Sequence, residues 1–269
     1  MRQAGRASVE TSGNGATAKF FELLTHAMES LLLLDYDGTL APFQTERDSA
    51  YPYPGVVPLL EEILRRGRSR VVIVTGRPVA DLRPLLGPLP TIEIWGAHGM
   101  EHLSVDGSYR QTAIAAEIAA SLSSAESWLV TAGLGDRVEV KPGGIAIHWR
   151  GLPADETERI QACAQESLAG YAKAQGLMLL EFDGGLELRV AHPNKGDAVR
   201  SILHASAASI PVAFLGDDVT DECAFQVLNS RGLSVLVRPE YRETHARVWL
   251  RPPDELIVFL QRWLGCLSA

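Results

Sequence analysis

Two carboxylates stand close together in the segment Asp35-Tyr36-Asp37-Gly38-Thr39, directly after the apolar run LLLL at 31–34. Alternate residues that leave a strand can face the same side, so Asp35 and Asp37 can converge beyond its end. Gly38 lets the chain turn where a side chain would clash. Such close carboxylates repel each other, and a hard cation such as Mg²⁺, which takes oxygen ligands, explains the pair best. The alternative is a strand followed by an Asp-Gly turn with no chemistry.

A second acidic cluster, GDDVTDE at 216–222, follows the apolar run PVAFL at 211–215. Acids crowded at a strand end are unfavourable unless they bind a cation or cap a helix. Asp221 and Glu222 favour the dipole of a following helix, so part of the cluster has a structural explanation. The spacing does not match the calcium loop of an EF-hand. Asp217, nearest the strand end, is the best metal candidate.

Two further segments offer groups that can meet a phosphate. Thr75-Gly76-Arg77 follows the run VVIV, and its hydroxyl and backbone amides can hold phosphate oxygens near a helix N-terminus. Lys195, in HPNKGD at 192–197, can meet a phosphate or hold an aspartate nucleophile in place. Taken alone, Thr75-Gly76-Arg77 is better explained by a strand-turn-helix connection, and a lone lysine beside a helix cap is normally just solvated.

The elements that must position these groups follow a repeated pattern, in which short apolar runs end in polar or glycine-containing turns and helical stretches follow. Runs without alternation are typical of strands buried on both faces, as in a parallel sheet flanked by helices. The predicted strands are 31–35, 71–75, 92–96, 211–217 and 233–237, and the predicted helices are 19–30, 56–66, 79–86, 197–207, 220–231 and 254–266. This is an α/β, doubly wound arrangement, in which ligands bind outside the carboxyl ends of the strands.

The stretch from about 103 to 190 breaks this rhythm. It predicts helices at 113–131 and 154–175 and strands at 137–140, 145–149, 177–182 and 186–190, with hairpin turns at Pro142-Gly143-Gly144 and Asp183-Gly184-Gly185. Because a helix-strand-strand unit occurs twice, we expect a small α+β domain inserted into the larger one. The predicted division is a flexible tail at 1–18, a core at 19–105 and 190–269, and the inserted domain at 106–189.

Composition narrows the function classes. The chain has 269 residues and a formal net charge of −8, which argues against a nucleic-acid partner. Its apolar runs are too short to span a bilayer, and no signal peptide is visible. The three cysteines form neither a disulfide framework nor a zinc pattern. We therefore expect a soluble, cytoplasmic globular protein with no nucleic-acid or membrane partner.

Together, the segments resemble in order the four motifs of the haloacid dehalogenase superfamily, and within it the trehalose-6-phosphate phosphatase family. The resemblance covers roughly 31–260 and rests on DYDGTLAPF (35–43), TGR (75–77), GAHGME (96–101), EVKPGGIAIHWR (139–150), ELRVAHPNKG (187–196) and GDDVTDE (216–222). It implies that the inserted domain is an αββαββ cap that sets substrate specificity. The sequence departs from the family at Thr75, where Ser is usual, at Trp149, in place of Tyr, and at Val190, where Pro is common.

The resemblance implies hydrolysis of trehalose 6-phosphate to trehalose and phosphate through an aspartyl-phosphate, in trehalose biosynthesis. It makes Asp35 the nucleophile and Asp37 the general acid and base, with Thr75 and Lys195 sharing the phosphoryl charge. It assigns Mg²⁺ to Asp35, the backbone carbonyl of Asp37 and Asp217, with Asp218 and Asp221 supporting these ligands. No sugar-transferring domain fits in this length, so trehalose-6-phosphate synthase is expected to be a separate chain.

The leaving sugar is uncharged, so specificity must come from hydrogen bonds to its hydroxyls. The expected substrate-binding residues are Arg77, His98, Glu101, Glu139, Lys141, His148, Arg150, Glu187 and Arg189. Of these, Glu139, Lys141 and Glu187 match the sugar-binding residues of the family. Three alternatives stay open: another sugar-phosphate phosphatase of the sucrose-phosphate or glycosyl-glycerate phosphate type, a phosphomutase with the same cap, or a non-catalytic phosphosugar-binding module.

Overall fold

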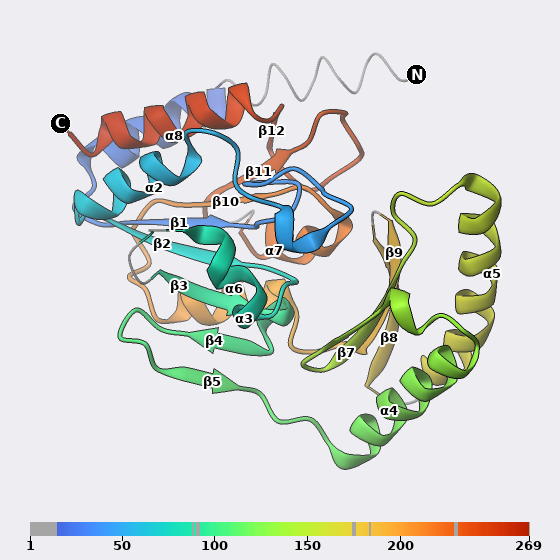
Figure 1. Cartoon of the computed structure of the whole chain (residues 1–269). Helices are drawn as coiled ribbons and strands as arrows, with labels where there is room; N and C mark the ends of the chain where they lie inside the picture. The colour runs from blue at the N-terminus through green and yellow to red at the C-terminus, as the bar shows by residue number, and fades with distance from the viewer. Residues whose placement is uncertain are drawn as a thin grey trace. The chain divides into compact units, whose positions relative to one another are not determined.

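The computed structural model describes residues 15–87, 89, 92–173, 176–182, 184–228 and 231–268 (Figure 1). The chain forms two compact units. The first comprises the described residues of Met1–Tyr109 and Lys195–Ala269, and the second is Arg110–Asn194.

A sheet of eight strands, counted over the described residues, forms the centre of the first unit. Its order is β12-β11-β10-β1-β2-β3-β4-β5. The strands are β1 (Ser30–Leu34), β2 (Ser69–Val74), β3 (Glu93–Gly96), β4 (Glu101–Leu103), β5 (Tyr109–Gln111), β10 (Val212–Gly216), β11 (Leu233–Val237) and β12 (Val248–Leu250). From β12 to β3 all neighbours are parallel, and β4 is antiparallel to β3. The parallel α/β core is confirmed, while β4, β5 and β12 were not predicted because they are short and lack long apolar runs.

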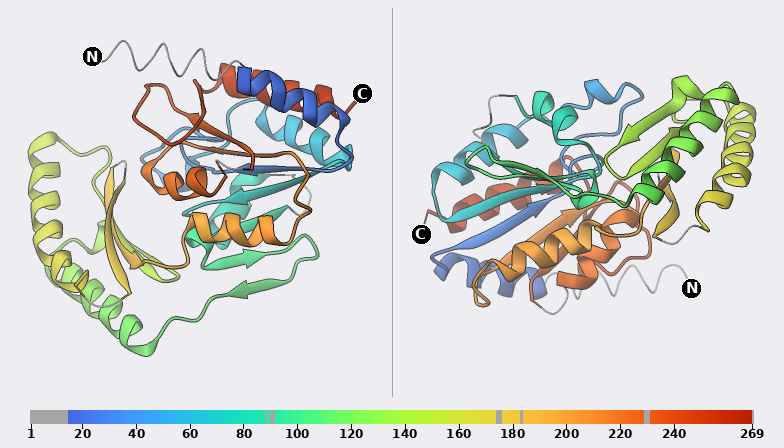
Figure 2. Two further views of the ribbon diagram at one scale, coloured as in Figure 1. Left: turned by 180° about the vertical axis from the view of Figure 1, so that it is seen from behind. Right: turned by 90° about the horizontal axis from the view of Figure 1, so that it is seen from below.

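Both faces of this sheet are covered by helices, which explains why its strands show no apolar-polar alternation. Leu32 and Leu34 face α2 (Val56–Arg65), α8 (Asp254–Cys266) and a helix over 15–26. Leu31 and Leu33 face α6 (Lys195–His204) and α7 (Glu222–Leu228) on the other side. Figures 1 and 2 show this layering of the first unit.

The beginning of the described chain differs from the prediction. Residues 15–18, predicted as part of a flexible tail, belong to the helix over 15–26, and the helix does not continue to residue 30. Phe20, Phe21 and Leu24 are buried, whereas Met28 is 79% exposed, because it lies beyond the helix end and so loses the helical spacing. Residues 1–14 of the predicted tail lie outside the described residues.

Shorter helical turns connect the strands. The predicted helix at 79–86 is divided into α3 (Val79–Leu82) and a 3-10 turn η2 (Arg83–Leu86), with Pro84 at the start of that turn. The other 3-10 turns are η1 (Arg47–Ser49), η3 (Ala97–Gly99), η4 (Gly135–Arg137) and η5 (Val219–Asp221).

The second unit has the element order αββαββ, as expected. It contains α4 (Ala116–Thr131), β6 (Val138–Lys141), β7 (Gly144–His148), α5 (Ala154–Tyr171), β8 (Leu177–Phe182) and β9 (Gly185–Val190). The strands form an antiparallel sheet in the order β6-β7-β9-β8. Both helices contact this sheet, and the apolar residues of β7 and β9, such as Ile147 and Leu188, are buried with Leu129 and Leu168 from α4 and α5. The sheet therefore has one apolar face and one face free for polar side chains.

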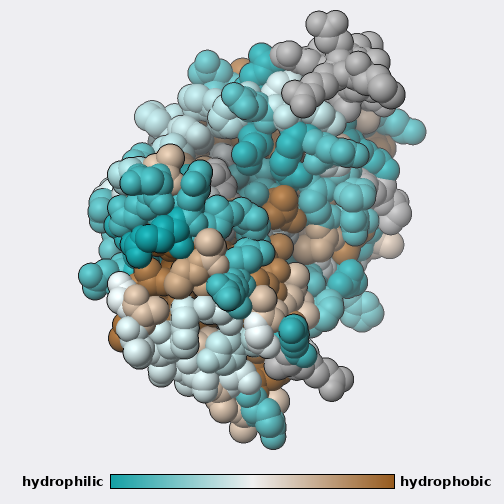
Figure 3. Space-filling view, turned by 90° about the vertical axis from the view of Figure 1, so that its right-hand side faces the viewer, coloured by the Kyte–Doolittle hydropathy of each residue, from teal (hydrophilic) through white to brown (hydrophobic). Residues whose placement is uncertain are grey.

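The surface on the side where α5 lies in Figure 1 is largely hydrophilic, with smaller hydrophobic areas between the polar side chains (Figure 3). Within the part of the chain that the structure describes, no helix combines the length and the apolar character needed to cross a membrane.

Candidate active site

Three neighbouring strands deliver the predicted catalytic groups to one edge of the sheet. β1 lies between β2 and β10, and the three run parallel, so Asp35, Thr75 and Asp217 all follow carboxyl ends. All three are buried, with relative exposures of 4%, 1% and 2%. Oxygen atoms of Asp35, Asp217 and Asp221 lie within 4.8 Å of one another. From β1 the chain crosses to β2, and from β10 it crosses in the opposite direction to β11; α/β sheets bind ligands where the crossovers diverge in this way.

Lys195, the first residue of α6, brings a buried amine into contact with these acids. Its Nζ lies 2.7 Å from Asp35 Oδ1 and 2.7 Å from Asp221 Oδ1. Burial by itself would lower the pKa of Lys195, but the charges of Asp221 and Asp35 outweigh it and raise this pKa well above its usual value. Lys195 therefore stays protonated between the two carboxylates.

Asp221 organises the loop that carries Asp217. Its Oδ2 accepts hydrogen bonds from the backbone N–H groups of Asp217 (3.1 Å) and Asp218 (3.0 Å), while Oδ1 contacts Lys195. The Asp218 side chain accepts from Val219 N–H and forms a capping box with Asp221 at η5. These contacts fit the predicted role of Asp218 and Asp221, which is to support the metal ligands. That role stays a prediction.

Asp217 differs from its neighbours, because neither carboxylate oxygen has a hydrogen-bond partner among the described residues, although both are fully buried. The nearest cation is Arg238, whose Nη1 is 4.0 Å from Oδ2. Burial first, and then the charges of Asp35 and Asp221, raise the pKa of Asp217 well above its usual value. Buried carboxylate oxygens are ordinarily satisfied, so this pair of oxygens points to a ligand that is a cation.

Gly38 makes room for that carboxylate. A Cβ atom at Gly38 would lie 2.2 Å from Asp217 Oδ2, and the residue has φ +76°, a conformation that side chains disfavour. The turn after β1 can thus approach the loop after β10 only with glycine here. The Asp-Gly spacing seen in the sequence has this packing reason.

The Asp37 carboxylate is paired with the guanidinium of Arg77. Arg77 Nε donates to Oδ2 (2.7 Å) and Nη2 donates to Oδ1 (2.6 Å), and the guanidinium lies 5.6 Å from the centroid of the Tyr36 ring. Thr75 Oγ1 accepts a hydrogen bond from the Arg77 backbone N–H. Arg77 therefore contacts the predicted general acid. Its predicted contact with substrate stays a prediction.

His98 and Glu101 lie in the same unit and are both buried. The His98 ring packs against Gly76, where a Cβ atom would approach Cε1 and Nε2 to 2.7 Å. Glu101 accepts from Val79 N–H at the start of α3 (2.8 Å) and from the Tyr109 hydroxyl (2.6 Å). Both oxygens of Glu101 are thus used structurally, and its predicted substrate contact stays a prediction.

The predicted sugar-binding residues of the second unit share the polar face of its sheet. Glu139 and Glu187 align across Ala146, and Lys141 and Arg189 align across Gly144. Lys141 Nζ lies 3.6 Å from Glu139 Oε2 and 3.4 Å from Glu187 Oε1. Gly144 and Ala146 are small, so charged groups from the flanking strands can meet over β7; a Cβ at Gly144 would lie 3.3 Å from Glu187 Oε1.

His148, Arg150 and Arg189 surround these groups. His148 Nε2 lies 2.8 Å from Glu139 Oε2. Arg150 packs over the turn at Gly184, where a Cβ would approach its side chain to 3.0 Å. Arg189 donates to the backbone carbonyls of Val190 (3.1 Å) and Pro193 (2.8 Å), so its guanidinium fastens the strand end.

Phe182, which the sequence reasoning missed, lies on the same sheet face. Its ring centroid is 5.8 Å from Lys141 Nζ and 5.4 Å from the His148 ring, and it covers Gly185. The sequence pattern that could have indicated this residue is an aromatic side chain followed two residues later by Gly-Gly.

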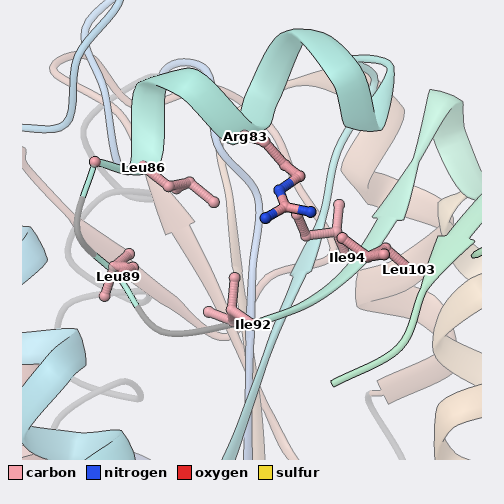
Figure 4. A pocket seen from close by; sticks show the side chains of 7 residues that line it. Arg83, Leu86, Leu89, Ile92, Ile94 and Leu103 are labelled. Atoms are coloured by element: carbon pink, nitrogen blue, oxygen red, sulfur yellow. The ribbon is translucent and has the colours of Figure 1, made fainter. Parts of the chain in front are cut away.

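A small cavity of about 50 Å³ lies elsewhere in the first unit, lined by Arg83, Leu86, Gly87, Leu89, Ile92, Ile94 and Leu103 (Figure 4). It has room for a few water molecules, and it contains none of the acidic residues. We do not assign the chemistry to it.

The chain is similar in sequence to known proteins. Residues 33–248 match the family model described as trehalose-phosphatase. A curated relative, trehalose-phosphate phosphatase of Mycobacterium ulcerans (strain Agy99), is 30% identical over 253 residues, 88% of this chain and 62% of the relative. The chain thus spans less than two thirds of the length of that relative.

Solved structures share the fold. The C-terminal domain of trehalose-6-phosphate phosphatase from C. albicans has a TM-score of 0.81 at 19% identity, covering 92% of this chain and 96% of that one. A trehalose-6-phosphate phosphatase related protein has a TM-score of 0.68 at 26% identity, with 89% and 100% covered. A haloacid dehalogenase-like hydrolase from B. subtilis has a TM-score of 0.61 at 16% identity, with 86% and 99% covered, so it shares the fold. With the family model matching most of its length, the chain belongs to the trehalose-phosphatase family.

Proposed function

We propose that the chain hydrolyses trehalose 6-phosphate to trehalose and phosphate with the help of Mg²⁺. The observation that carries the proposal is the buried pair of Asp35 and Lys195, 2.7 Å apart, beside the carboxylate of Asp217, which has no hydrogen-bond partner among the described residues. Membership of the trehalose-phosphatase family and a relative named trehalose-phosphate phosphatase support the substrate.

The donor set fits a hard divalent cation. Asp35 and Asp217 offer buried oxygens close together, and no sulfur or imidazole ligand belongs to this cluster of described residues. Asp35, Asp217 and the backbone carbonyl of Asp37 would hold the ion. When bound, Mg²⁺ supplies positive charge that offsets the repulsion between a phosphate dianion and an anionic nucleophile.

Asp35 is the proposed nucleophile. Burial, then the charge of Asp221, raises the pKa of Asp35 to about 7, and Lys195 opposes this shift. Lys195 thus favours the ionised carboxylate that attacks, and it also places a positive charge beside the phosphoryl oxygens. Attack forms a bond between an Asp35 oxygen and phosphorus, and the bond from phosphorus to the sugar oxygen breaks.

Asp37 is the proposed proton carrier. It gives a proton to the departing sugar oxygen, and then takes one from the water that attacks phosphorus and releases phosphate from Asp35. Arg77, through its two contacts of 2.6 and 2.7 Å, fixes the orientation of the Asp37 carboxylate. Proton transfer therefore requires Asp37 to be shared between Arg77 and the substrate.

The polar sheet face of the second unit is the proposed binding surface for the sugar. Glu139, Lys141 and Glu187 offer both acceptors and a donor, which suits the hydroxyls of an uncharged disaccharide. A charged hydrogen bond to such a group contributes about 1.5–3 kcal/mol, so three of them can separate related sugars.

The test is phosphate release from trehalose 6-phosphate, sucrose 6-phosphate, glucose 6-phosphate and an aryl phosphate, with Mg²⁺ and with a chelator. We expect metal-dependent turnover with a strong preference for trehalose 6-phosphate, lost in Asp35→Asn. Preference for another sugar phosphate would retain the chemistry and overturn the substrate. No turnover of any of them by the folded protein would overturn the proposal.

A further inference from the structure

The segment after β11, residues 238–247, reaches the loop that carries Asp217. β11 is the parallel neighbour of β10, so the residues that follow the two strands lie at the same sheet edge (Figure 1). From this segment, Arg242 Nε donates to the backbone carbonyl of Asp217 (3.2 Å), and Nη2 donates to that of Asp218 (2.8 Å).

Arg242 is itself held in place. Its Nη1 pairs with Glu222 Oε1 and donates to the backbone carbonyl of Glu243 (2.9 Å). Glu222 in turn accepts from the Thr244 hydroxyl and from His245 N–H, both at 2.8 Å. The side chains of Arg242 and Glu222 are only 20% and 19% exposed. This network therefore ties the start of α7 to the 238–247 segment.

The backbone of Asp217 is thus bound on both sides. Its N–H donates to Asp221 Oδ2, and its carbonyl accepts from Arg242. The Asp217 carboxylate lies beside the like charges of Asp35 and Asp221, which would push it away. A backbone held at both ends keeps this carboxylate close to the other two despite their repulsion.

We propose that Arg242 is a positioning residue of the metal site, which holds Asp217 ready to receive a divalent cation, and that Glu222 holds Arg242. The inference rests on the proposed function, in which Asp217 is a metal ligand. Lysine would not replace Arg242, because one ammonium cannot reach two carbonyls and a carboxylate with the spread of a planar guanidinium.

The experiment measures Mg²⁺ binding to the whole protein by calorimetry, and the Mg²⁺ dependence of phosphate release. For Arg242→Gln we expect the Kd for Mg²⁺ to rise about tenfold or more, the usual effect of losing a residue that orients a ligand. Arg242→Lys and Glu222→Gln should weaken binding less. At saturating Mg²⁺, kcat should return close to that of the wild type.

The matched control is Arg68→Lys, since Arg68 also donates to backbone carbonyls, those of Ala27 and Leu267, but precedes β2 at the opposite end of the strands. It should lower the Tm and leave the Kd for Mg²⁺ unchanged. If both Arg242→Lys and Glu222→Gln bind Mg²⁺ as the wild type does, whatever their Tm, this inference is overturned and the proposed function is unaffected. If the wild type takes up no Mg²⁺, the inference and the metal part of the proposed function fail together.

Discussion

In the first unit, charged groups lie beyond the ends of parallel strands; in the second, they stand on the face of an antiparallel sheet. Asp35, Asp217 and Lys195 are 5% exposed or less, and hydrogen bonds from loops surround them. Glu139 and Lys141, by contrast, are spaced by strand register over the small residues of β7. The first arrangement holds a few charges close together, which suits the phosphoryl transfer that we propose. The second arrangement spreads hydrogen-bond donors and acceptors over a surface, which suits the sugar binding that we propose.

The largest expected effect is in the buried cluster. Asp217→Asn should abolish measurable Mg²⁺ binding and lower phosphate release on the order of 10²-fold or more from sugar and aryl phosphates alike. It should also raise the Tm of the metal-free protein, because a buried carboxyl group with no hydrogen-bond partner among the described residues, lying beside two other acids, is replaced by a neutral amide; each kcal/mol gained corresponds to roughly 2–4 °C. Calorimetry and thermal unfolding in chelator check both. A lower metal-free Tm would show that Asp217 stabilises the fold.

On the sheet face that we propose binds the sugar, a substitution should affect the two kinds of substrate differently. Glu187→Ala should lower kcat/KM for trehalose 6-phosphate about 10- to 100-fold, the loss of a charged hydrogen bond, and spare a small aryl phosphate. Glu181→Gln on β8, an exposed site whose carboxylate contacts Gln161, is the control. Equal losses on both substrates would place Glu187 in the chemistry or the fold instead.

The pH dependence of stability should report on the buried acidic cluster of the first unit. Burial raises the pKa of Asp35 from 3.8 to about 7, so between these values the folded state binds more protons than the unfolded state. The metal-free protein should therefore lose stability as the pH rises from about 4 to 7. Saturating Mg²⁺ should flatten this slope, because the ion binds the ionised ligands. Unfolding in chelator and in Mg²⁺ measures it, and a rising curve in chelator would contradict the pKa shift.

The smallest effect is expected at Glu101. Glu101→Gln should cost about 1 kcal/mol of stability, since its carboxylate caps α3 and accepts from Tyr109, and should leave KM unchanged. Burial and the hydrogen bond to Glu101 raise the pKa of Tyr109 to about 12, and this pKa should fall toward 10 in the variant. A raised KM for the sugar phosphate would support the substrate contact expected from the sequence.

In both regions, the sequence could predict the features that depend on strand ends and hairpin turns. Asp35, Thr75 and Asp217 come directly after buried apolar runs, and parallel strand ends meet at one edge, so their convergence required no tertiary detail. The αββαββ order was also readable, because the hairpin turns and the helical stretches between them are distinct.

Long side chains from irregular segments were not predictable. Arg77 contacts Asp37 and Arg242 contacts two carbonyls after β10, although nothing in their sequence spacing indicates the partner. The flexible guanidinium can reach many places, and packing alone decides which. Phe182 is similar, since its place over Gly185 depends on the pairing of β8 with β9.

The order of strands also has a consequence for folding. β1 pairs with β10, and between them the chain passes through the whole second unit. During synthesis, β1 and β2 therefore emerge long before β10, while the second unit is complete in one stretch of chain. We expect the second unit to fold early, and the joining of β1 to β10, a contact between distant parts of the chain, to be slow. The acidic cluster, which combines Asp35 after β1 with Asp217 and Asp221 after β10, then comes together only in this late step.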